Sequence, residues 1–199
     1  MPRRSDHARR RAEITAAAWR VIRRAGIDGA TTRAIAAEAG CSLSVLAHFF
    51  GAKEDLLVAA QTAMYDRIVE RALDAVGERG GLDALAGALD SALPLDEERA
   101  FDAAVNVAFA AAALSDPALA AARIGAHERI RELLDAPIAQ ARAAGELRED
   151  LDAVAVADEF IVLVEGGILL GLVDADLGDE LTARLTRVAG AFIARLRRA

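Results

Sequence analysis

The chain has 199 residues, of which 54% are hydrophobic and 4% aromatic, and its formal net charge at pH 7 is −7. This apolar content excludes wholesale disorder, and a sequence rich in alanine and poor in aromatics favours helices over strands. The single cysteine excludes an internal disulfide and fits a cytoplasmic location. The most apolar runs are shorter than the roughly 20 residues that cross a bilayer, so we expect no membrane span.

Charge is distributed unevenly along the chain. Residues 1–53 contain ten Lys or Arg and four Asp or Glu, whereas residues 54–199 contain fourteen and twenty-seven. The first part therefore carries +6 and the second −13. A basic end on an acidic chain is the asymmetry expected when that end alone meets a polyanion such as nucleic acid.

Three helices are predicted in the basic part of the chain. An apolar stripe at spacings of three and four residues covers residues 6–25 and stops at Gly26, a usual position for a terminating glycine. Two shorter helices follow over residues 32–39 and 43–50, with Gly40 between them. Serine or threonine stands directly before each short helix, as expected of an N-cap.

The rest of the chain predicts six longer helices separated by glycine, proline and acidic residues. Gly125 and Pro137 are possible interruptions of the fourth of these helices. We therefore expect an all-α protein of about nine helices, with an N-terminal domain over residues 1–52 and a larger helical domain over residues 53–199. The six expected helices cover residues 53–76, 82–93, 96–114, 118–143, 150–173 and 179–198.

The two short helices match the template of a helix-turn-helix. Helices that cross steeply need a small residue at the contact, supplied by Ala36, and a left-handed residue in the turn, supplied by Gly40. The remaining inward positions are apolar: Ile35, Ala39, Cys41, Leu46 and Phe49. The outward face then carries Ser42, Leu43, Ser44, Ala47 and His48. A helix pair without a ligand would explain the apolar stripe, but not this turn or the local basic charge.

The same residues carry a family resemblance. The chain resembles the DNA-binding domain of the tetracycline-repressor (TetR) family through Thr31-Thr32-Arg33, Ile35-Ala36, Ala39-Gly40, His48-Phe49-Phe50, Lys53 and Leu56-Leu57. Residues 94–145 and the final helices are similar to the ligand-binding domain of the choline-responsive repressor subgroup. The resemblance implies a homodimer joined through its last two helices, a double-stranded and palindromic DNA operator, and a small-molecule effector.

The resemblance also implies roles for single residues. Thr31, Thr32 and Lys53 would hold phosphates, while Arg33, Leu43, Ser44 and His48 would approach bases. The family commonly has a backbone-contacting tyrosine at position 47, and Ala47 lacks that contact. The predicted DNA-binding set is Thr31, Thr32, Arg33, Ser42, Leu43, Ser44, Ala47, His48 and Lys53.

The residues themselves support several of these roles. Thr31 stands at a helix N-terminus, where free N–H groups favour a phosphate. Lys53 is the only lysine in the chain and opens a helix, where its charge opposes the helix dipole, so a phosphate partner is expected. Arg33 can grip guanine bidentately. The basic residues at positions 3, 4 and 9–11 are expected to form an arm that reaches DNA, although a solvated tail is the alternative.

Polar residues in the apolar helices of the larger domain are candidates for an effector site. Asn106 must bond either a neighbouring helix or a ligand, and Glu165 poses the same choice or lies at the dimer seam. The subgroup resemblance suggests choline. Quaternary ammonium groups are usually held by several aromatic rings, however, and few aromatics follow residue 60. We therefore expect an amphipathic or acyl-like effector. The candidate ligand-binding residues are Phe101, Val105, Asn106, Phe109, His127 and Glu165.

The sequence thus predicts a sequence-specific transcriptional regulator, acting as a repressor that a small hydrophobic or amphipathic ligand releases from its operator. No catalytic residue set, metal site, cofactor motif or phosphate loop is visible, so we do not expect an enzyme. Two alternatives remain open at this point. The protein could be a helix-turn-helix regulator without an effector, controlled by a partner or constitutively bound, or it could be a helical ligand carrier.

Overall fold

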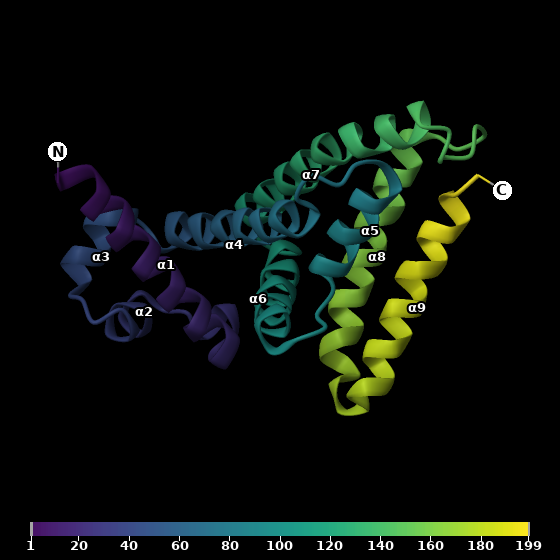
Figure 1. The fold of residues 1–199 in the computed structure, drawn as a ribbon. Coiled ribbons are helices and arrows are strands. Elements are labelled where there is room, and N and C mark those ends of the chain that lie inside the picture. The colour runs from purple at the N-terminus through teal and green to yellow at the C-terminus, as the bar shows by residue number, and fades with distance from the viewer. Residues whose placement is uncertain (1, 199) are drawn as a thin grey trace. The chain divides into compact units, whose positions relative to one another are not determined.

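The computed structural model describes residues 2–198, with the backbone alone for residues 2–5 and 177. Helices dominate this part of the chain, as predicted, and the described segments outside them pair as strands only in an isolated bridge between Leu147 and Arg197. None of the helices described is long and apolar enough to cross a membrane. The elements are α1 (Pro2–Gly29), α2 (Thr32–Glu38), α3 (Leu43–Phe50), α4 (Lys53–Val76), α5 (Gly81–Ala92), α6 (Glu97–Ala113), α7 (Pro117–Ala143), α8 (Ala153–Val173), a 3₁₀ turn (Ala175–Leu177) and α9 (Asp179–Leu196) (Figure 1).

The chain divides into two compact units, which we call the first and second unit. The first comprises Met1–Tyr65 and Ala104–Ile124, and the second comprises Asp66–Ala103 and Gly125–Ala199. Each unit therefore contains part of α4, α6 and α7. The functional boundary at residues 52 and 53 stays a prediction, because compactness alone does not define a DNA-binding domain.

Helix α1 provides the apolar stripe that organises the first unit. Its predicted stop at Gly26 is present as a kink with φ 68°, after which a final helical turn continues to Gly29. Of the six predicted stripe residues, Ile14, Ala17, Ala18, Val21 and Ile22 are buried, whereas Ala25, next to the kink, is exposed. Glycine accepts this positive φ without strain, so the kink marks the end of the regular helix as the sequence indicates.

Trp19 links α1 to α4 within the first unit. Its indole Nε1–H donates a hydrogen bond to the backbone oxygen of Ala60, at 2.9 Å. The side chain is half-buried, which agrees with the packing role expected of a tryptophan next to an apolar stripe. The bond also satisfies the one polar atom that burial of an indole would otherwise leave unpaired.

The second unit has a core contributed by α5, α7, α8 and α9. The end of α7 is tied to the end of α9 because Arg148 N–H donates to Leu196 O and Arg198 N–H donates to Glu146 O. These bonds form the isolated bridge and close one end of the helical layer. The buried core residues are Leu82, Leu85, Leu89, Leu134, Ile138, Ala141, Leu147, Val156, Ala157, Phe160, Phe192 and Leu196.

Helix α7 is continuous, so neither of the two possible interruptions breaks it. Pro137 lies inside the helix, where it removes one backbone hydrogen bond. Leu134 and Ile138, on either side of it, are buried in the core of the second unit. Most helix stability in proteins comes from packing of an apolar face, and this anchoring explains why the helix survives the proline.

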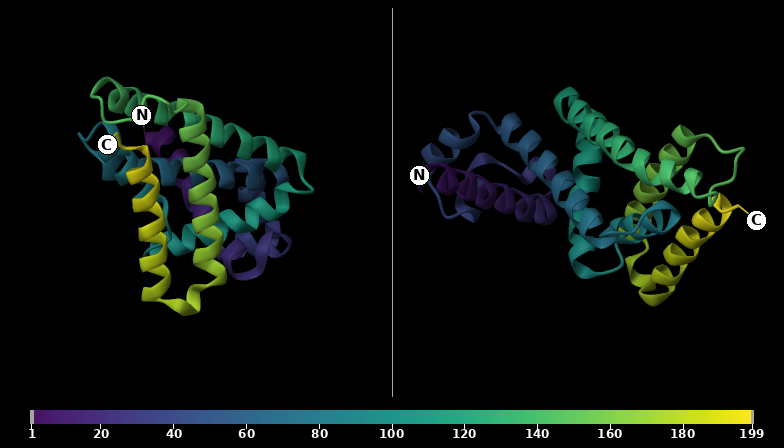
Figure 2. Two further views of the ribbon diagram at one scale, coloured as in Figure 1. Left: turned by 90° about the vertical axis from the view of Figure 1, so that its right-hand side faces the viewer. Right: turned by 45° about the horizontal axis from the view of Figure 1, so that its top comes forward.

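Helices α8 and α9 form an antiparallel pair joined by a short turn, and they run side by side in all views (Figures 1 and 2). Glycines on the inner side of α8 allow close packing. A Cβ atom on Gly167 would lie 2.5 Å from Leu93, and one on Gly171 would lie 2.2 Å from Pro94. These two small residues therefore serve packing within the chain.

Candidate functional site

The turn between α2 and α3 has the geometry that a helix-turn-helix needs. Gly40 adopts φ 59°, and no heavy atom outside its immediate chain neighbours lies within 4 Å of the position a Cβ would take. The Cys41 N–H donates to Ala36 O at 2.9 Å, which closes the turn against the small residue at the helix crossing. The glycine is thus required by its backbone conformation and not by lack of space.

Both short helices begin with the predicted N-caps. The Thr31 hydroxyl oxygen accepts a hydrogen bond from Ala34 N–H at 3.1 Å, and Ser42 Oγ accepts one from Val45 N–H at 3.2 Å. Ser42 and Ser44 also pair through their hydroxyls at 2.8 Å. The two serines therefore form a fixed polar edge at the N-terminal end of α3.

The structure buries two of the five predicted inward positions fully and three only in part. Ile35, Ala36 and Leu46 are buried as expected, whereas Ala39 and Cys41 are half-buried. Phe49 is also half-buried, and the adjacent Phe50 occupies the core position instead. Successive side chains on a helix point about 100° apart, so only one of two consecutive phenylalanines can face the core. The sequence pattern alone does not show which of the two it is.

The outward face predicted for α3 is exposed. Solvent reaches Ser42, Leu43, Ser44, Ala47 and His48, as well as Thr31 and Arg33 at the start of α2. Thr32 and Lys53 are half-buried. All nine residues of the predicted DNA-binding set therefore lie at least partly on the surface of the first unit, and their contacts with DNA stay a prediction.

Helix α1 fastens α3 through arginines that the sequence suggested for a DNA-reaching arm. Arg11 donates to Phe49 O at 2.8 Å and places its guanidinium 4.3 Å from the centre of the Phe50 ring. Arg10 bonds Glu13 at 2.7 Å and reaches Ala39 O at 3.4 Å. These two residues hold the helix-turn-helix in place and belong to a helix, not an extended arm. The side chains of residues 3 and 4 lie outside those described.

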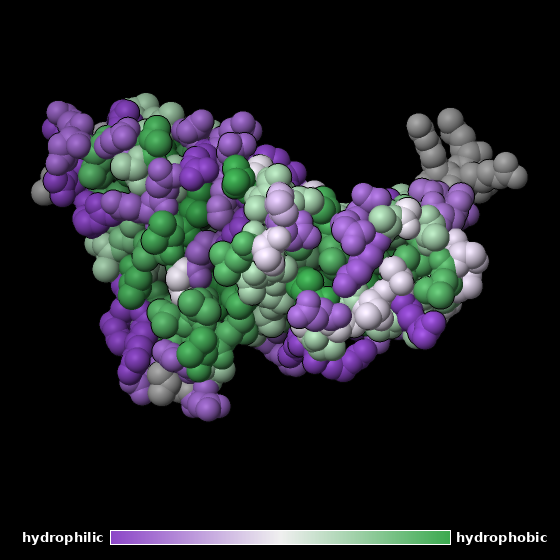
Figure 3. Space-filling model, turned by 180° about the vertical axis from the view of Figure 1, so that it is seen from behind, coloured by the Kyte–Doolittle hydropathy of each residue, from purple (hydrophilic) through white to green (hydrophobic). Residues whose placement is uncertain are grey.

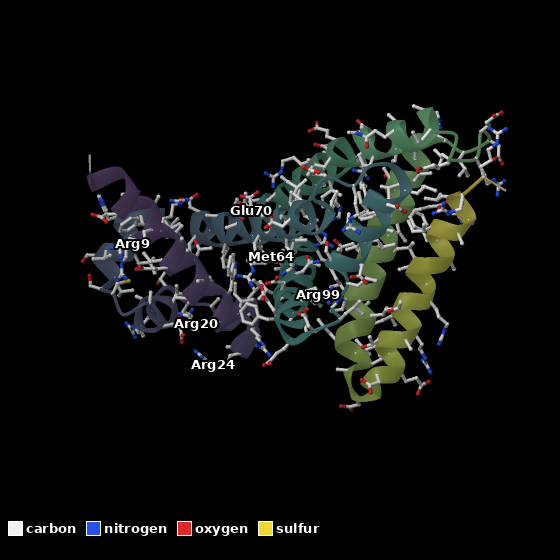
Figure 4. The ribbon with its side chains drawn as sticks, in the orientation of Figure 1. Arg9, Arg20, Arg24, Met64, Glu70 and Arg99 are labelled. Atoms are coloured by element: carbon white, nitrogen blue, oxygen red, sulfur yellow. The ribbon has the colours of Figure 1, made fainter. Side chains whose placement is uncertain are left out.

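Two further arginines of α1 bind α2. Arg20 Nε donates to Glu38 at 2.7 Å, and Arg24 lies 3.4 Å from the same carboxylate; both side chains extend from α1 in Figure 4. The hydrogen bond from Arg20 lowers the pKa of Glu38 below its ordinary value, with a smaller contribution from Arg24. The carboxylate thus neutralises charge that would otherwise add to the basic surface.

His7 is a member of this surface that sequence reasoning did not select. It is exposed, its ring centre lies 4.5 Å from that of Phe49, and it lies 6.3 Å from that of His48. The two histidines bring titratable groups from α1 and α3 to one face. Across the part of the chain that the structure describes, no group of His, Cys, Asp and Glu side chains could hold a metal ion.

The candidate ligand residues are divided between the two units. Val105, Asn106 and Phe109 belong to the first unit, whereas Phe101, His127 and Glu165 belong to the second. Val105, Asn106 and Phe109 are buried, and the other three are half-buried. Their common role in ligand binding stays a prediction.

Asn106 bonds neighbouring helices, which was one of the two roles open to it. Its Oδ1 accepts from Arg123 Nη1 of α7 at 2.9 Å and from the Tyr65 hydroxyl of α4 at 3.3 Å. The same Arg123 nitrogen donates to the Tyr65 oxygen at 2.8 Å. Sequence reasoning missed Tyr65 and Arg123, because residues on three helices meet here only in the fold.

His127 and Glu165 form a second polar pair, within the second unit. His127 Nε2 lies 3.0 Å from Glu165 Oε1, and both side chains are half-buried. The pair joins α7 to α8. Glu165 therefore bonds a neighbouring helix, while its use by a ligand or at a dimer seam stays a prediction.

Comparison with known proteins identifies the family. Residues 81–198 match the family model described as BetI-type transcriptional repressor, C-terminal, and residues 14–60 match the one for bacterial regulatory proteins of the tetR family. The HTH-type transcriptional regulator PksA of Bacillus subtilis (strain 168) is 31% identical over 175 residues, which cover 87% of this chain and 84% of that protein.

The chain belongs to the TetR family. This TetR-family protein is a DNA-binding transcriptional regulator with a BetI-type C-terminal domain, and the family is one of regulators, not enzymes. The prediction of fold and family is confirmed, and the reading as a helical ligand carrier with an incidental basic end is set aside.

Solved structures agree with this assignment. A transcriptional regulator from Rhodococcus sp. Rha1 is 28% identical, with a TM-score of 0.78 over 95% of this TetR-family chain and 98% of the other. A regulator from Saccharomonospora viridis, solved in complex with choline, is 20% identical with a TM-score of 0.83 over 96% and 100% of the two chains. At that identity the second likeness shows the fold alone.

Proposed function

We propose that the protein is a homodimeric repressor that binds a palindromic operator through the exposed face of α3 and the start of α2, and that a small molecule releases it. The observation that carries the DNA-binding part is the outward polar face of α3 beside a glycine turn held by α1. A major groove admits one α-helix, and residues near the N-terminus of that helix reach base edges.

Residues of this face divide by chemistry into base-reading and phosphate-binding groups. Arg33 is exposed at the start of α2 and can bond guanine O6 and N7 together. The paired hydroxyls of Ser42 and Ser44 suit bases or phosphates, and exposed His48 lies one to two turns further along α3. Lys53 opens α4 beside the motif, where a phosphate is the partner we expect.

Dimerisation is proposed through α8 and α9. Exposed valines and leucines follow one face of α8, including Val162, Leu169 and Val173, which are 69%, 50% and 72% exposed. Gly166 on the same face meets nothing within 4 Å of an added Cβ, so it offers a close approach to another helix. Figure 3 shows hydrophobic side chains gathered over the part of the second unit that these helices occupy. Large exposed apolar patches of this kind mark interaction surfaces.

For the effector we propose an amphipathic or acyl-like molecule. Phe101, Val105 and Phe109 recur every four residues on α6 and share one face of that helix. A second candidate is choline, because a regulator of the same fold has been solved with it. Glu165 could supply the charge for a cation, although few aromatic rings are present beyond residue 60 to enclose it.

The first test measures the binding of a DNA fragment from upstream of the protein's own gene by fluorescence anisotropy between 50 and 200 mM salt. If the dimer makes about six to ten phosphate contacts, affinity should fall roughly 10³–10⁵-fold over this range. Lys53→Ala should weaken binding to all sequences equally and make the salt dependence shallower. Arg148→Ala, which removes the same charge from an exposed ion pair with Asp150, is the matched control and should change neither.

Loss of the operator complex on adding an apolar or amphipathic compound would support the effector-released repressor. A regulator without a small-molecule effector would bind the same fragment but respond to none of the compounds. An unchanged salt dependence in Lys53→Ala would show that this lysine holds no phosphate.

A further inference from the structure

One fully buried polar side chain in the first unit is left without hydrogen bonds. Gln61 lies on α4 and is 0% exposed, and neither its Nε2 nor its Oε1 has a hydrogen-bond partner among the described residues. It stands in the middle of a buried stripe whose other members are Leu56, Leu57, Ala60, Met64 and Tyr65. Met64 marks this stretch of α4 in Figure 4.

This arrangement is costly for the protein alone. A side-chain amide that leaves water without new partners loses the hydrogen bonds of two N–H donors and one oxygen acceptor. An apolar side chain of the same size, such as methionine, would fill the position without that loss. Buried polar groups without partners are rare, so a ligand or an ordered water is the ordinary explanation for one.

The surroundings of Gln61 show what a ligand would meet. Tyr65 follows one helical turn later on the same face, and its hydroxyl belongs to the network with Asn106 and Arg123. Residue 60, directly before Gln61, provides the carbonyl that the Trp19 indole bonds. Gln61 therefore lies between a buried polar network and the point where α1 is attached to α4.

We propose that Gln61 binds the polar end of the effector, and that this end is a neutral group with a hydrogen-bond donor beside an acceptor, as in an amide. Such a group satisfies both orphaned atoms of Gln61 at once. A carboxylate would satisfy Nε2 alone, and a trimethylammonium group has neither an N–H donor nor an acceptor. The inference deepens the proposed function, because it rests on the protein responding to a small molecule.

Binding at this position would also affect the DNA-binding end. The Trp19–Ala60 hydrogen bond joins α1, which holds α2 and α3, to the turn of α4 that contains Gln61. A ligand changes the DNA-binding equilibrium only if it binds one state better than the other. A ligand that fits one position of this turn of α4 binds more tightly to the state in which α1 has the matching position. Such a ligand therefore changes the affinity of the protein for DNA.

The test uses four probes with the same chain length: octanamide, N,N-dimethyloctanamide, octanoate and octyltrimethylammonium. Trp19 is the only tryptophan in the sequence, so its fluorescence reports events next to residue 60 without a label. Octanamide should change this fluorescence and bind at least about tenfold more tightly than the other three. Gln61→Met should weaken the binding of octanamide at least about tenfold and leave the affinities for the other three probes unchanged.

The stability of the ligand-free protein supplies the second readout. Gln61→Met should raise its melting temperature by about 2–4 °C, because an unsatisfied amide is replaced by an apolar side chain of similar volume. Thr15→Val is the matched control: Thr15 is buried and its hydroxyl donates to Arg11 O at 3.0 Å, so this variant should melt lower and bind octanamide unchanged.

Equal affinity for octanamide in wild type and Gln61→Met, or preference of wild type for one of the other probes, would overturn the proposal. A fall in melting temperature for Gln61→Met would do the same, since it would show that the amide is satisfied by ordered water. Both readouts use the protein without DNA. Failure of the wild type to bind its operator would therefore contradict the proposed function and leave this test unaffected.

Discussion

The helix-turn-helix and the α8–α9 pair both present a helical face to solvent, and the two faces have opposite character. The exposed face of α3 carries hydroxyls and an imidazole, with Leu43 as its one large apolar side chain. The exposed face of α8 carries valines and leucines. Polar groups suit a hydrated polyanion, whereas apolar area is stabilised by a complementary protein surface.

The two regions also differ in how they are held in place. The helix-turn-helix depends on local features: two N-caps, a left-handed glycine, and arginines of α1 that bond backbone oxygens. The α8–α9 pair depends on close packing, with Gly167 and Gly171 pressed against Leu93 and Pro94. Exposed polar residues are therefore the candidates for a binding surface in the helix-turn-helix, whereas exposed apolar residues are the candidates in the α8–α9 pair.

The largest effect is expected from a charge on the apolar face of α8. Val162→Glu should convert the proposed dimer to monomer, because a carboxylate buried in an apolar interface has no partner. Operator affinity should then fall by at least about 100-fold, since each monomer reads a single half-site. Analytical ultracentrifugation measures the first effect and anisotropy the second.

Leu114→Glu is the control for this variant. Leu114 is 91% exposed but lies outside α8 and α9, so the same charge there should leave the mass of the species unchanged. A Val162→Glu protein that sediments like the wild type would contradict the proposal that the apolar face of α8 forms the dimer interface.

A smaller effect is expected from Arg33→Ala. Truncating a bidentate reader of guanine should cost about 1–3 kcal/mol at one base pair of each half-site and relax specificity there. Affinities for a set of single-base operator variants measure it. Equal weakening on every variant would assign Arg33 to a phosphate instead, and would shift the reading of bases to α3 alone.

Gly40→Ala tests the local support of the first region. The φ of 59° is unfavourable for a residue with a Cβ even though space is open around it, so the variant should lose about 1–2 kcal/mol of unfolding free energy. Urea titration followed by circular dichroism measures the loss. Gly125→Ala, inside α7 with ordinary helical backbone and open space at the Cβ position, should be neutral or slightly stabilising.

The smallest effect concerns pH. Because the folded-state pKa of Glu38 is lowered, its bonds to Arg20 and Arg24 stabilise the fold above the ordinary carboxyl pKa. This contribution to stability is lost as the pH falls through the lowered pKa that Glu38 has in the folded state. Urea midpoints of wild type and Glu38→Gln should differ at pH 7 and converge towards pH 3. A constant difference across this range would show that charge on Glu38 contributes nothing, and exposed Glu132→Gln is the control.

Much of the fold follows from local sequence signals. The sequence alone predicts the N-caps Thr31 and Ser42 and the glycines that end helices, because capping and positive φ depend on neighbouring residues. The choice between Phe49 and Phe50 was wrong by one position, since it depends on how α1 crosses the motif. The continuity of α7 through Pro137 depends likewise on core contacts that the sequence does not display.

The candidate site divides in the same way. The exposed face of α3 was predictable, because a helical period fixes which residues point away from the core. The network of Tyr65, Asn106 and Arg123 was not, because its members come from three helices. Gln61 does have a signal in the sequence, because it is a polar residue within an apolar stripe of α4.

Lys53 is the only lysine in the sequence, so the chain has a single ε-amino group for chemical modification. Reagents that acylate ε-amino groups have a single target in the sequence, and that target stands half-buried where α4 begins, beside the helix-turn-helix. Because an α-amino group reacts with the same reagents, the rate at Lys53 is obtained by subtracting the rate measured for Lys53→Arg under the same conditions. Intact-mass measurements with and without operator can follow the occupancy of this one amine over time.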